Sequence, residues 1–140
     1  MKALIDTCVI LDTLQAREPF SDAANKIFLT AAINTFDGYI SAKSMTDIYY
    51  ITHRYTHSDK ESRKVLEKIL VIFKLLDTFG EDCRRAILSK TTDYEDAVMI
   101  ETAVRSKIDC IVTRNTADYN NSAVAVYTPD EFLKIVSKDD

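Results

Sequence analysis

Hydrophobic positions along the chain follow two alternating patterns. Short apolar runs predict buried strands, whereas longer stretches with an apolar residue at every third or fourth position predict amphipathic helices. The strands predicted in this way cover residues 3–5, 38–41, 76–79, 110–113 and 123–126. The predicted helices cover residues 22–33, 44–55, 58–75, 81–89, 94–107 and 129–136, and a further helix starts near Val9.

This alternation predicts the fold class. Strands that alternate with helices are joined by crossover connections and form a mainly parallel sheet. The strands are almost uniformly apolar, as expected when helices cover both faces of a sheet. We therefore predict an α/β fold with three layers, α/β/α, built on a mainly parallel sheet of short strands. In open sheets of this kind, ligands bind beyond the carboxyl ends of the strands.

The length and composition agree with one ordinary globular domain. The 140 residues fit a single domain, which we expect to span 1–140. Three cysteines without C-x-x-C spacing indicate free thiols in a reducing cytoplasm. No apolar run approaches the roughly 20 residues that cross a bilayer, so we expect no membrane association. The net charge of −4 excludes a protein that holds nucleic acid through a generally basic surface.

Two acids stand where the pattern makes them noticeable. Asp6 directly follows the first predicted strand, at the edge where open sheets bind ligands, although it could also serve only as the cap of the next helix. Asp96 lies on the face of its helix that carries Ile100 and Ala103. A carboxylate on a buried face is unfavourable by several kcal/mol unless it is paired, hydrogen-bonded or bound to a metal. Asp96 is therefore the stronger candidate for a functional site.

The polar neighbours of Asp96 have structural explanations. Thr92 and Glu95 have the spacing of a capping box, which would satisfy the first backbone donors of the helix. Glu95 and Thr102 fall together on the polar side of the same helix. We therefore expect these three side chains to cap the helix or to face solvent.

Two more segments supply oxygen ligands near the same sheet edge. Asp47 flanks the apolar stripe of its helix, where an ordinary solvated acid is an equally good interpretation. The polar loop after the fourth predicted strand carries Asn115 and Asp118. Acids that converge at one edge repel each other, and Mg²⁺ or Mn²⁺, which prefer oxygen ligands, would stabilise them. Such a site can activate water and neutralise a phosphodiester, as metal-dependent nucleases and phosphatases do.

Several other chemistries lack their residues. The sequence contains neither of the glycine-rich motifs that bind nucleotides, G-x-G-x-x-G and G-K-[ST]. Cys8 stands where an Asp-x-Asp phospho-acceptor motif needs its second acid. None of the cysteines has the arginine six positions later that a cysteine-dependent phosphatase requires. His53 and His57 are four residues apart, but no third zinc ligand accompanies them.

Taken together, these segments resemble the PIN-domain family of metal-dependent ribonucleases, which includes the VapC-like toxins. Each segment alone is a weak signal, but their order and spacing are specific, and the resemblance covers essentially the whole chain. The matching segments are 4–12 with Asp6 at the strand end, 40–51, 93–97, 111–119 and the ending 128–133.

The resemblance implies roles for individual residues. Asp6 and Asp96 match the two best-defined metal-binding acids, and Asp47 matches the second acid, which is more often Glu among the toxins. Asn115 stands where many members carry Asp, and Asp118 follows one turn later. Either residue could be the remaining ligand, and the charge of Asp118 favours it.

The resemblance also implies contacts around the metal. Thr7 and Thr113 would orient ligands, water or substrate, and Arg114 would contact a substrate phosphate. Cys8 departs from the commoner Asn at its position, which affects a hydrogen bond beside the metal site rather than the site itself.

By this resemblance we expect a Mg²⁺- or Mn²⁺-dependent endoribonuclease that hydrolyses single-stranded or structured RNA and is the toxin of a toxin–antitoxin pair. An antitoxin protein and a second copy of the chain are the implied partners, with the helix face 65–73 as a candidate dimer contact or simply part of the core. Two alternatives remain open. One is a non-catalytic or degenerate PIN-like interaction protein held by a small partner, and the other is a nuclease that acts on DNA or on flaps.

Overall fold

The computed structural model describes residues 1–138 and contains a five-stranded parallel sheet. Its strand order is β3-β2-β1-β4-β5, so β1 lies in the centre, and every neighbouring pair is parallel. The predicted α/β fold with a parallel sheet is therefore confirmed. Residues 139 and 140 of the predicted domain lie outside the described part. The strands are β1 (Lys2–Ile5), β2 (Asp37–Ser41), β3 (Lys74–Leu76), β4 (Cys110–Val112) and β5 (Ala125–Tyr127).

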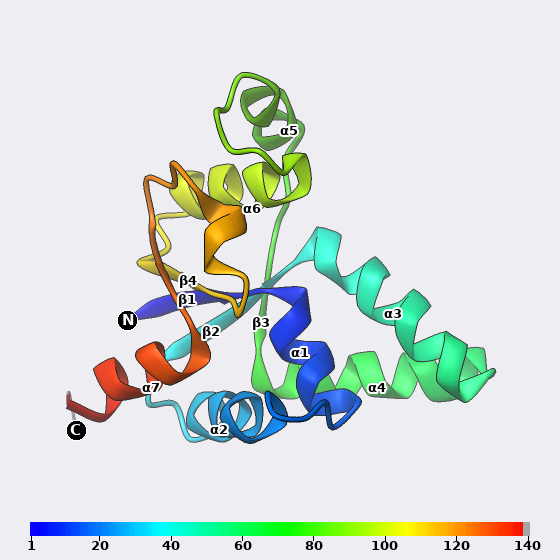
Figure 1. Ribbon diagram of the computed structural model, residues 1–140. Helices are drawn as coiled ribbons and strands as arrows, with labels where there is room; N and C mark the ends of the chain where they lie inside the picture. Colours follow the sequence, from blue (N-terminus) through cyan, green and yellow to red (C-terminus); the bar gives the residue numbers. More distant parts are fainter. Residues whose placement is uncertain (139–140) are drawn as a thin grey trace.

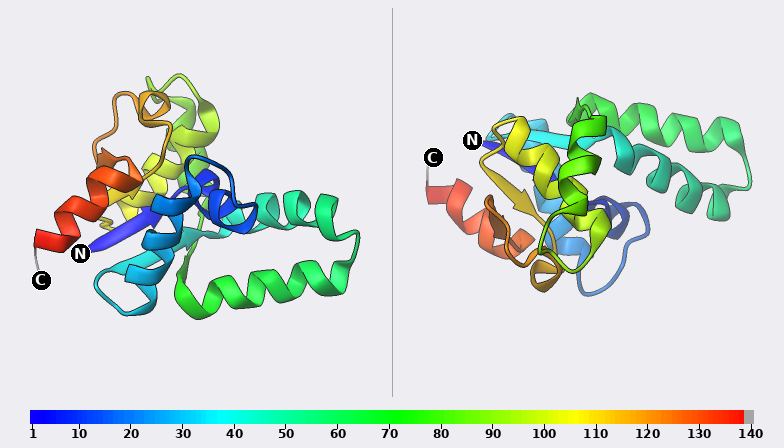
Figure 2. Two further views of the ribbon diagram at one scale, coloured as in Figure 1. Left: turned by 60° about the horizontal axis from the view of Figure 1, so that its bottom comes forward. Right: turned by 90° about the horizontal axis from the view of Figure 1, so that it is seen from above.

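Helices cover both faces of this sheet (Figure 1). The first, second and last helices pack together on one face, and α5, α6 and the 3₁₀ helix η1 lie on the other. The pair α3 and α4 extends sideways away from the sheet (Figure 2). Within residues 1–138, no helix combines the length and apolar character needed to span a membrane. The helices are α1 (Thr7–Leu14), α2 (Ser21–Ala32), α3 (Ala42–Thr56), α4 (Asp59–Ile72), α5 (Gly80–Ile87), α6 (Tyr94–Arg105), η1 (Thr116–Tyr119) and α7 (Pro129–Lys138).

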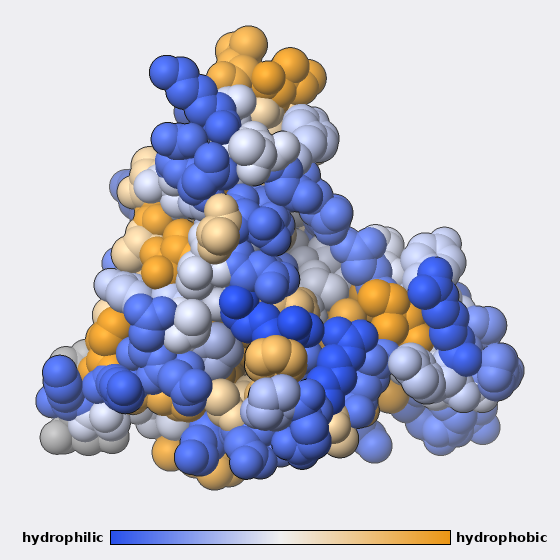
Figure 3. Space-filling model, viewed as in Figure 1, coloured by the Kyte–Doolittle hydropathy of each residue, from blue (hydrophilic) through white to orange (hydrophobic). Residues whose placement is uncertain are grey.

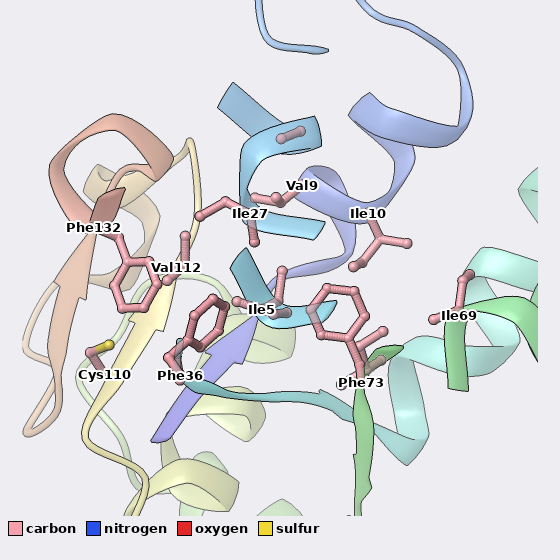
Figure 4. Packing of buried hydrophobic residues seen from close by; sticks show 14 of the residues in the cluster. Ile5, Val9, Ile10, Ile27, Phe36, Ile69, Phe73, Cys110, Val112 and Phe132 are labelled. Carbon is pink, nitrogen blue, oxygen red and sulfur yellow. The ribbon is translucent and has the colours of Figure 1, made fainter. Parts of the chain in front are cut away.

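The central strand sends alternate side chains into two cores. Ala3 and Ile5 enter the larger core, against α1, α2 and α7, whereas Leu4 enters the smaller core against α6. In the larger core, Phe36 and Phe132 meet edge to face with ring centres 4.8 Å apart (Figure 4). Because β1 is buried on both sides, its carboxyl end is fixed relative to the helices above and below it.

The junction between α4 and β3 differs from the prediction. The helix ends three residues earlier than predicted, and the strand begins two residues earlier. Phe73 ends the helix with an extended backbone (φ −110°, ψ 145°), and its ring is buried in the larger core. No glycine or proline marks this junction, so the apolar pattern of the helix runs on into the strand and hides the boundary.

A buried ion pair joins α5 to α6. Asp82 is 1% exposed and accepts two hydrogen bonds from Arg105, at 2.8 and 3.0 Å, and one from the hydroxyl of Thr102 at 2.9 Å. The prediction that Thr102 faces solvent is therefore wrong, because its hydroxyl is buried against this carboxylate. Burial raises the pKa of Asp82, but hydrogen bonds from Arg105, the Phe79 N–H and Thr102 outweigh it and hold the pKa below its ordinary value.

This pair should make part of the folding stability depend on pH. Because the pKa of Asp82 is lower in the folded chain, its contribution is complete above about pH 5 and is lost as the pH falls through the folded pKa. Asp82→Asn should lower the free energy of unfolding at pH 7 by about 2 kcal/mol and flatten its decline below about pH 5. Urea unfolding at several pH values measures both effects. Glu67→Gln, which changes an exposed acid on α4, is the control, and equal behaviour of the two variants would contradict the prediction.

Candidate active site

Asp6 performs two tasks at the carboxyl end of β1. It is the N-cap of α1, and its Oδ1 accepts a hydrogen bond from the N–H of Thr7 at 2.7 Å. Its Oδ2 accepts a hydrogen bond from the hydroxyl of Thr113 at 2.8 Å, just beyond the neighbouring strand β4. The helix cap and the carboxylate at the sheet edge, which the sequence left as alternatives, are thus combined in one side chain.

Asp96 approaches the same place from the first turn of α6. The N-cap of this helix is Asp93, whose carboxylate accepts a hydrogen bond from the N–H of Asp96 at 3.0 Å. The predicted capping box of Thr92 and Glu95 is therefore wrong. Thr92, the residue before the N-cap Asp93, instead donates its N–H to the side chain of Asn120 at 3.2 Å.

Strong electrostatic coupling marks this part of the molecule. Asp96 is half-buried, and its pKa is raised to about 7, first by burial, then by the negative charges of Asp6 and Asp93, and to a smaller extent by Asp118. Burial and the charges of Asp6 and Asp96 also raise the pKa of the Tyr119 hydroxyl. Carboxylates that interact in this way favour a proton or a cation between them.

The groups around the pair suit a hard divalent cation. Tyr119 is 2% exposed, and its hydroxyl lies beside the carboxylates of Asp6 and Asp96 without a hydrogen bond of normal geometry among the described residues. Such a hydroxyl needs a hydrogen-bond partner, and the two carboxylates need a positive charge. A cation with its water ligands would supply both. Residues 1–138 contain no cluster of three or more His, Cys, Asp or Glu side chains arranged to hold a metal. The groups that are present, two carboxylates and a buried hydroxyl, offer only oxygen atoms, which suit Mg²⁺ or Mn²⁺ because these ions take one or two carboxylates and keep several waters.

Asp47 lies at the rim and already has a partner. Its carboxylate accepts a hydrogen bond from the ammonium group of Lys43 at 2.8 Å, one turn earlier on α3. The same ammonium group pairs with Glu95 on α6. Lys43 thus links α3 to α6 and offsets two negative charges beside the site. That Asp47 is a metal ligand remains a prediction.

Asn115 and Asp118 follow β4 at the same sheet edge. The backbone N–H of Asn115 donates to the hydroxyl oxygen of Thr113 at 3.1 Å, so this residue is tied to Asp6 through one intermediate. Asp118 is exposed in η1, and its charge contributes to the raised pKa of Asp96. Both residues are therefore connected to the carboxylate pair, and the choice between them as ligand remains a prediction.

The Cys8 thiol on α1 and the Thr113 hydroxyl after β4 both contact the Asp6 carboxylate. Thr113 is fully buried, and the sulfur of Cys8 lies 3.6 Å from both the Thr113 hydroxyl oxygen and Oδ2 of Asp6. Burial, followed by the charge of Asp6, raises the pKa of the Cys8 thiol to about 11. The thiol therefore stays protonated at neutral pH, where it acts as a weak donor to the carboxylate.

Arg114 takes part in an ion pair that the sequence analysis did not find. Its Nε and Nη2 donate to the two oxygens of Asp12 at 2.8 and 3.1 Å, and Asp12 is 1% exposed on α1. The guanidinium carbon also lies 4.2 Å from the centre of the Phe20 ring. The sequence did contain a signal for this ion pair, because Asp12 directly follows the apolar run 9–11. The reasoning that singled out Asp96, an acid on an apolar helix face, applies to Asp12 as well.

Comparison with known proteins identifies the family. A family model described as PIN domain matches residues 2–117, which include the carboxylate pair and most of the sheet. The chain belongs to the PIN domain family. Members of this family are generally nucleases, so the resemblance stated from the motifs is confirmed at this level. No curated protein sequence matches the chain.

Solved structures that share this fold include VapBC and FitAB proteins and one toxin–antitoxin complex. VapBC2 from Rickettsia felis, bound to a DNA fragment from its promoter, has a TM-score of 0.67 at 15% identity over 90% of this chain and 97% of that one. A toxin–antitoxin complex from Klebsiella pneumoniae has a TM-score of 0.65 at 20% identity, and FitAcB from Neisseria gonorrhoeae has 0.65 at 19%. Both cover 91% of this chain and 97% of their own. These likenesses confirm the fold.

The coupling within this PIN-domain site can be measured without metal. Asp6→Asn removes a negative charge but keeps a side chain that can cap α1, so it should lower the pKa of Asp96 from about 7 while burial keeps it above its ordinary value. Titration of the carboxyl ¹³C shifts by NMR measures this change. Asp22→Asn, an exposed acid on α2, is the control that should have no effect. An Asp96 that titrates identically in both variants would show that the two carboxylates are not coupled.

Proposed function

We propose that this PIN domain is a Mg²⁺- or Mn²⁺-dependent endoribonuclease that hydrolyses RNA phosphodiesters. The observation that carries the proposal is the coupled pair Asp6 and Asp96 at the carboxyl edge of the sheet, beside the unpartnered hydroxyl of Tyr119. When bound there, the divalent ion would neutralise charge on the phosphate and lower the pKa of a water ligand. Family membership supports nuclease chemistry, and the motif resemblance to metal-dependent ribonucleases favours RNA.

The residues around the pair have separate tasks in this proposal. The N–H of Thr7 and the hydroxyl of Thr113 hold the Asp6 carboxylate in one orientation, which lowers the reorganisation needed for binding. Asp96 supplies the second carboxylate from α6. The buried ring of Tyr119 excludes bulk water from the protein side of the pair.

Polar residues at the rim would complete the site. Asp118, whose charge acts on Asp96, is the proposed further ligand, either directly or through water, and Asn115 is its alternative. The negative charge of Asp47 is offset by its ion pair with Lys43, so we propose that Asp47 contacts the metal ion through a water molecule rather than by direct coordination. The Lys43 ammonium group would in turn face an incoming phosphate at the rim.

Cleavage assays with matched variants test the nuclease proposal. Asp6→Asn and Asp96→Asn should each reduce the rate of RNA cleavage in Mn²⁺ by about 100-fold or more, because each removes a carboxylate that holds the ion. Chelation with EDTA should abolish cleavage, and Asp22→Asn should cleave normally. RNA and DNA of one sequence are compared side by side to identify the preferred nucleic acid. Undiminished cleavage by either site variant, or cleavage of DNA alone, would refute the proposal.

We also propose that the chain is the toxin of a toxin–antitoxin pair. One solved neighbour is described as a toxin–antitoxin complex, and this chain has a cavity of about 570 Å³ between the end of α1 and the pair α3 and α4. Apolar and hydroxyl side chains, among them Leu14, Thr52, Tyr55 and Val65, line most of it, together with Gln15 and Arg17. A small partner that inserts an apolar segment would bury these groups.

Co-expression with the small protein encoded beside this gene tests the pairing. The two proteins should co-elute and nuclease activity should fall, whereas Tyr55→Glu should weaken the complex at least about 10-fold because it places a charge in the cavity. Tyr50→Glu, on α3 but outside this cavity, is a matched control, since Tyr50 and Tyr55 are 65% and 67% exposed. No complex, or equal weakening by both variants, would contradict the proposed partner site.

The alternative is a PIN domain without catalysis that acts only through its partner. Its supporting observation is that Lys43 already offsets Asp47, while residues 1–138 hold no ready-made cluster of three ligands. Isothermal titration separates the two proposals, because the non-catalytic domain would bind no Mg²⁺ or Mn²⁺.

The homodimer remains a prediction. Within the proposed helix face 65–73, Ile69 and Phe73 belong to the core, and Val71 is highly exposed. A second apolar surface lies at the end of α5, where Ile87 and Leu88 are exposed, and an orange patch is visible over this part of the molecule at the top of Figure 3. Both surfaces are available to a second copy of the chain.

A further inference from the structure

A buried ion pair lies between one and two helical turns from Asp6. Asp12 sits six residues after Asp6 on α1, which corresponds to about 9 Å along the helix axis. Its two oxygens accept hydrogen bonds from Nε and Nη2 of Arg114 at 2.8 and 3.1 Å. A bidentate contact of this kind fixes both distance and orientation, so it ties α1 firmly to the segment after β4.

The same two segments carry the groups that hold Asp6. The residue before Arg114 is Thr113, whose hydroxyl donates to Asp6 at 2.8 Å, and the residue after it is Asn115, whose N–H donates to Thr113. Any sliding or rotation of α1 relative to the end of β4 would therefore disturb the Asp6 contacts first. The ion pair with Asp12 opposes that movement from the other end of the helix.

The contacts of Arg114 occupy most of its guanidinium group, so little of the group is available to a substrate. Two of its nitrogens donate to Asp12, and one face of its guanidinium covers the Phe20 ring at 4.2 Å. Its side chain is 25% exposed. A phosphate that recruited this group would have to leave the buried Asp12 carboxylate without its bidentate partner, which is strongly unfavourable.

We propose that Asp12 and Arg114 act as positioning residues that hold α1 against the end of β4 and thereby fix Asp6 and Thr113 in their binding geometry. Arg114, which the motif resemblance assigns to substrate phosphate, would act through Asp12 instead. The consequence for catalysis rests on the proposed nuclease function, whereas the consequence for the geometry of the site does not.

Two single variants and one double variant test the pair. Asp12→Asn and Arg114→Met should each lower kcat by about 10- to 100-fold with KM changed less than about 3-fold, and weaken Mn²⁺ binding in calorimetry by about 10-fold. Asp12→Leu combined with Arg114→Met should lose no more than either single variant. This double variant also guards against unfolding, because apolar replacement of both partners of a buried pair is often neutral for stability. A folded double variant with normal kcat and Mn²⁺ affinity would overturn the proposal.

Two further substitutions separate position from charge. Arg17→Met removes a second arginine, which lies 3.8 Å from Asp12 without a bidentate contact, and should change kcat less than about 2-fold. Arg114→Lys keeps the charge but loses the planar fork, so it should resemble Arg114→Met. Full rescue by lysine, or an equal loss in Arg17→Met, would show that charge alone matters.

RNA binding distinguishes a phosphate contact from a positioning role. In the Asp6→Asn background, a phosphate contact by Arg114 would make Arg114→Met reduce the salt dependence of RNA affinity by about one unit in the log–log slope, while Asp12→Asn would not. The positioning role predicts an unchanged slope in both variants.

Hydrogen exchange tests the geometry independently of any nuclease activity. Both Asp12→Asn and Arg114→Met should exchange amides at least about 10-fold faster in residues 6–9 and 113–118, with β2 unaffected. If the wild type cleaves no RNA but these segments still loosen, the proposed function fails and the positioning role stands. Unchanged exchange would overturn the positioning role.

Discussion

Parallel pairing between β1 and β4 aligns Ile5 with Val112, and the site depends on this register. The residues that follow the two strands, Asp6 and Thr113, consequently meet, and the backbone N–H of Asp6 continues the ladder by donating to Val112 at 2.9 Å. A shift of the register by one residue would move Leu4 into the core that holds Ala3 and Ile5, and these two into the core of Leu4, so packing in both cores enforces the same alignment that the site requires.

The opposing constraint is repulsion between acids brought to one edge. The molecule moderates it with backbone and side-chain donors: Asp6 and Asp93 each cap a helix, and Lys43 pairs with two acids at the rim. Helix N-termini also favour negative charge nearby. The negative charge of Asp96 is offset less by such donors, and its pKa is raised accordingly. The site is thus a local concentration of negative charge that the fold tolerates because most of its members are hydrogen-bonded.

The parts of the structure that depend on local pattern could be predicted from the sequence. The parallel α/β fold follows from the alternation of strands and helices, and the positions of Asp6 and Asp96 follow from a strand end and a helix face. The ion pairs of Asp12 with Arg114 and of Asp82 with Arg105 could not be predicted, because each joins residues more than twenty positions apart. The end of α4 was predicted three residues too late, because Phe73 leaves the helix and its ring packs in the larger core. Tertiary packing, rather than the local pattern, determines this boundary.

The double task of Asp6 has a consequence for how this family changes over time. A relative that lost its catalytic role would still need a side chain at this position to cap α1, since loss of a helix cap destabilises a protein by about 1 kcal/mol. Selection for folding alone would therefore preserve Asp6 or a residue such as Asn. Asp96 has no such capping task, because Asp93 performs it. Under the proposed function, an acid retained at position 96 is therefore a better marker of an active descendant than one retained at position 6.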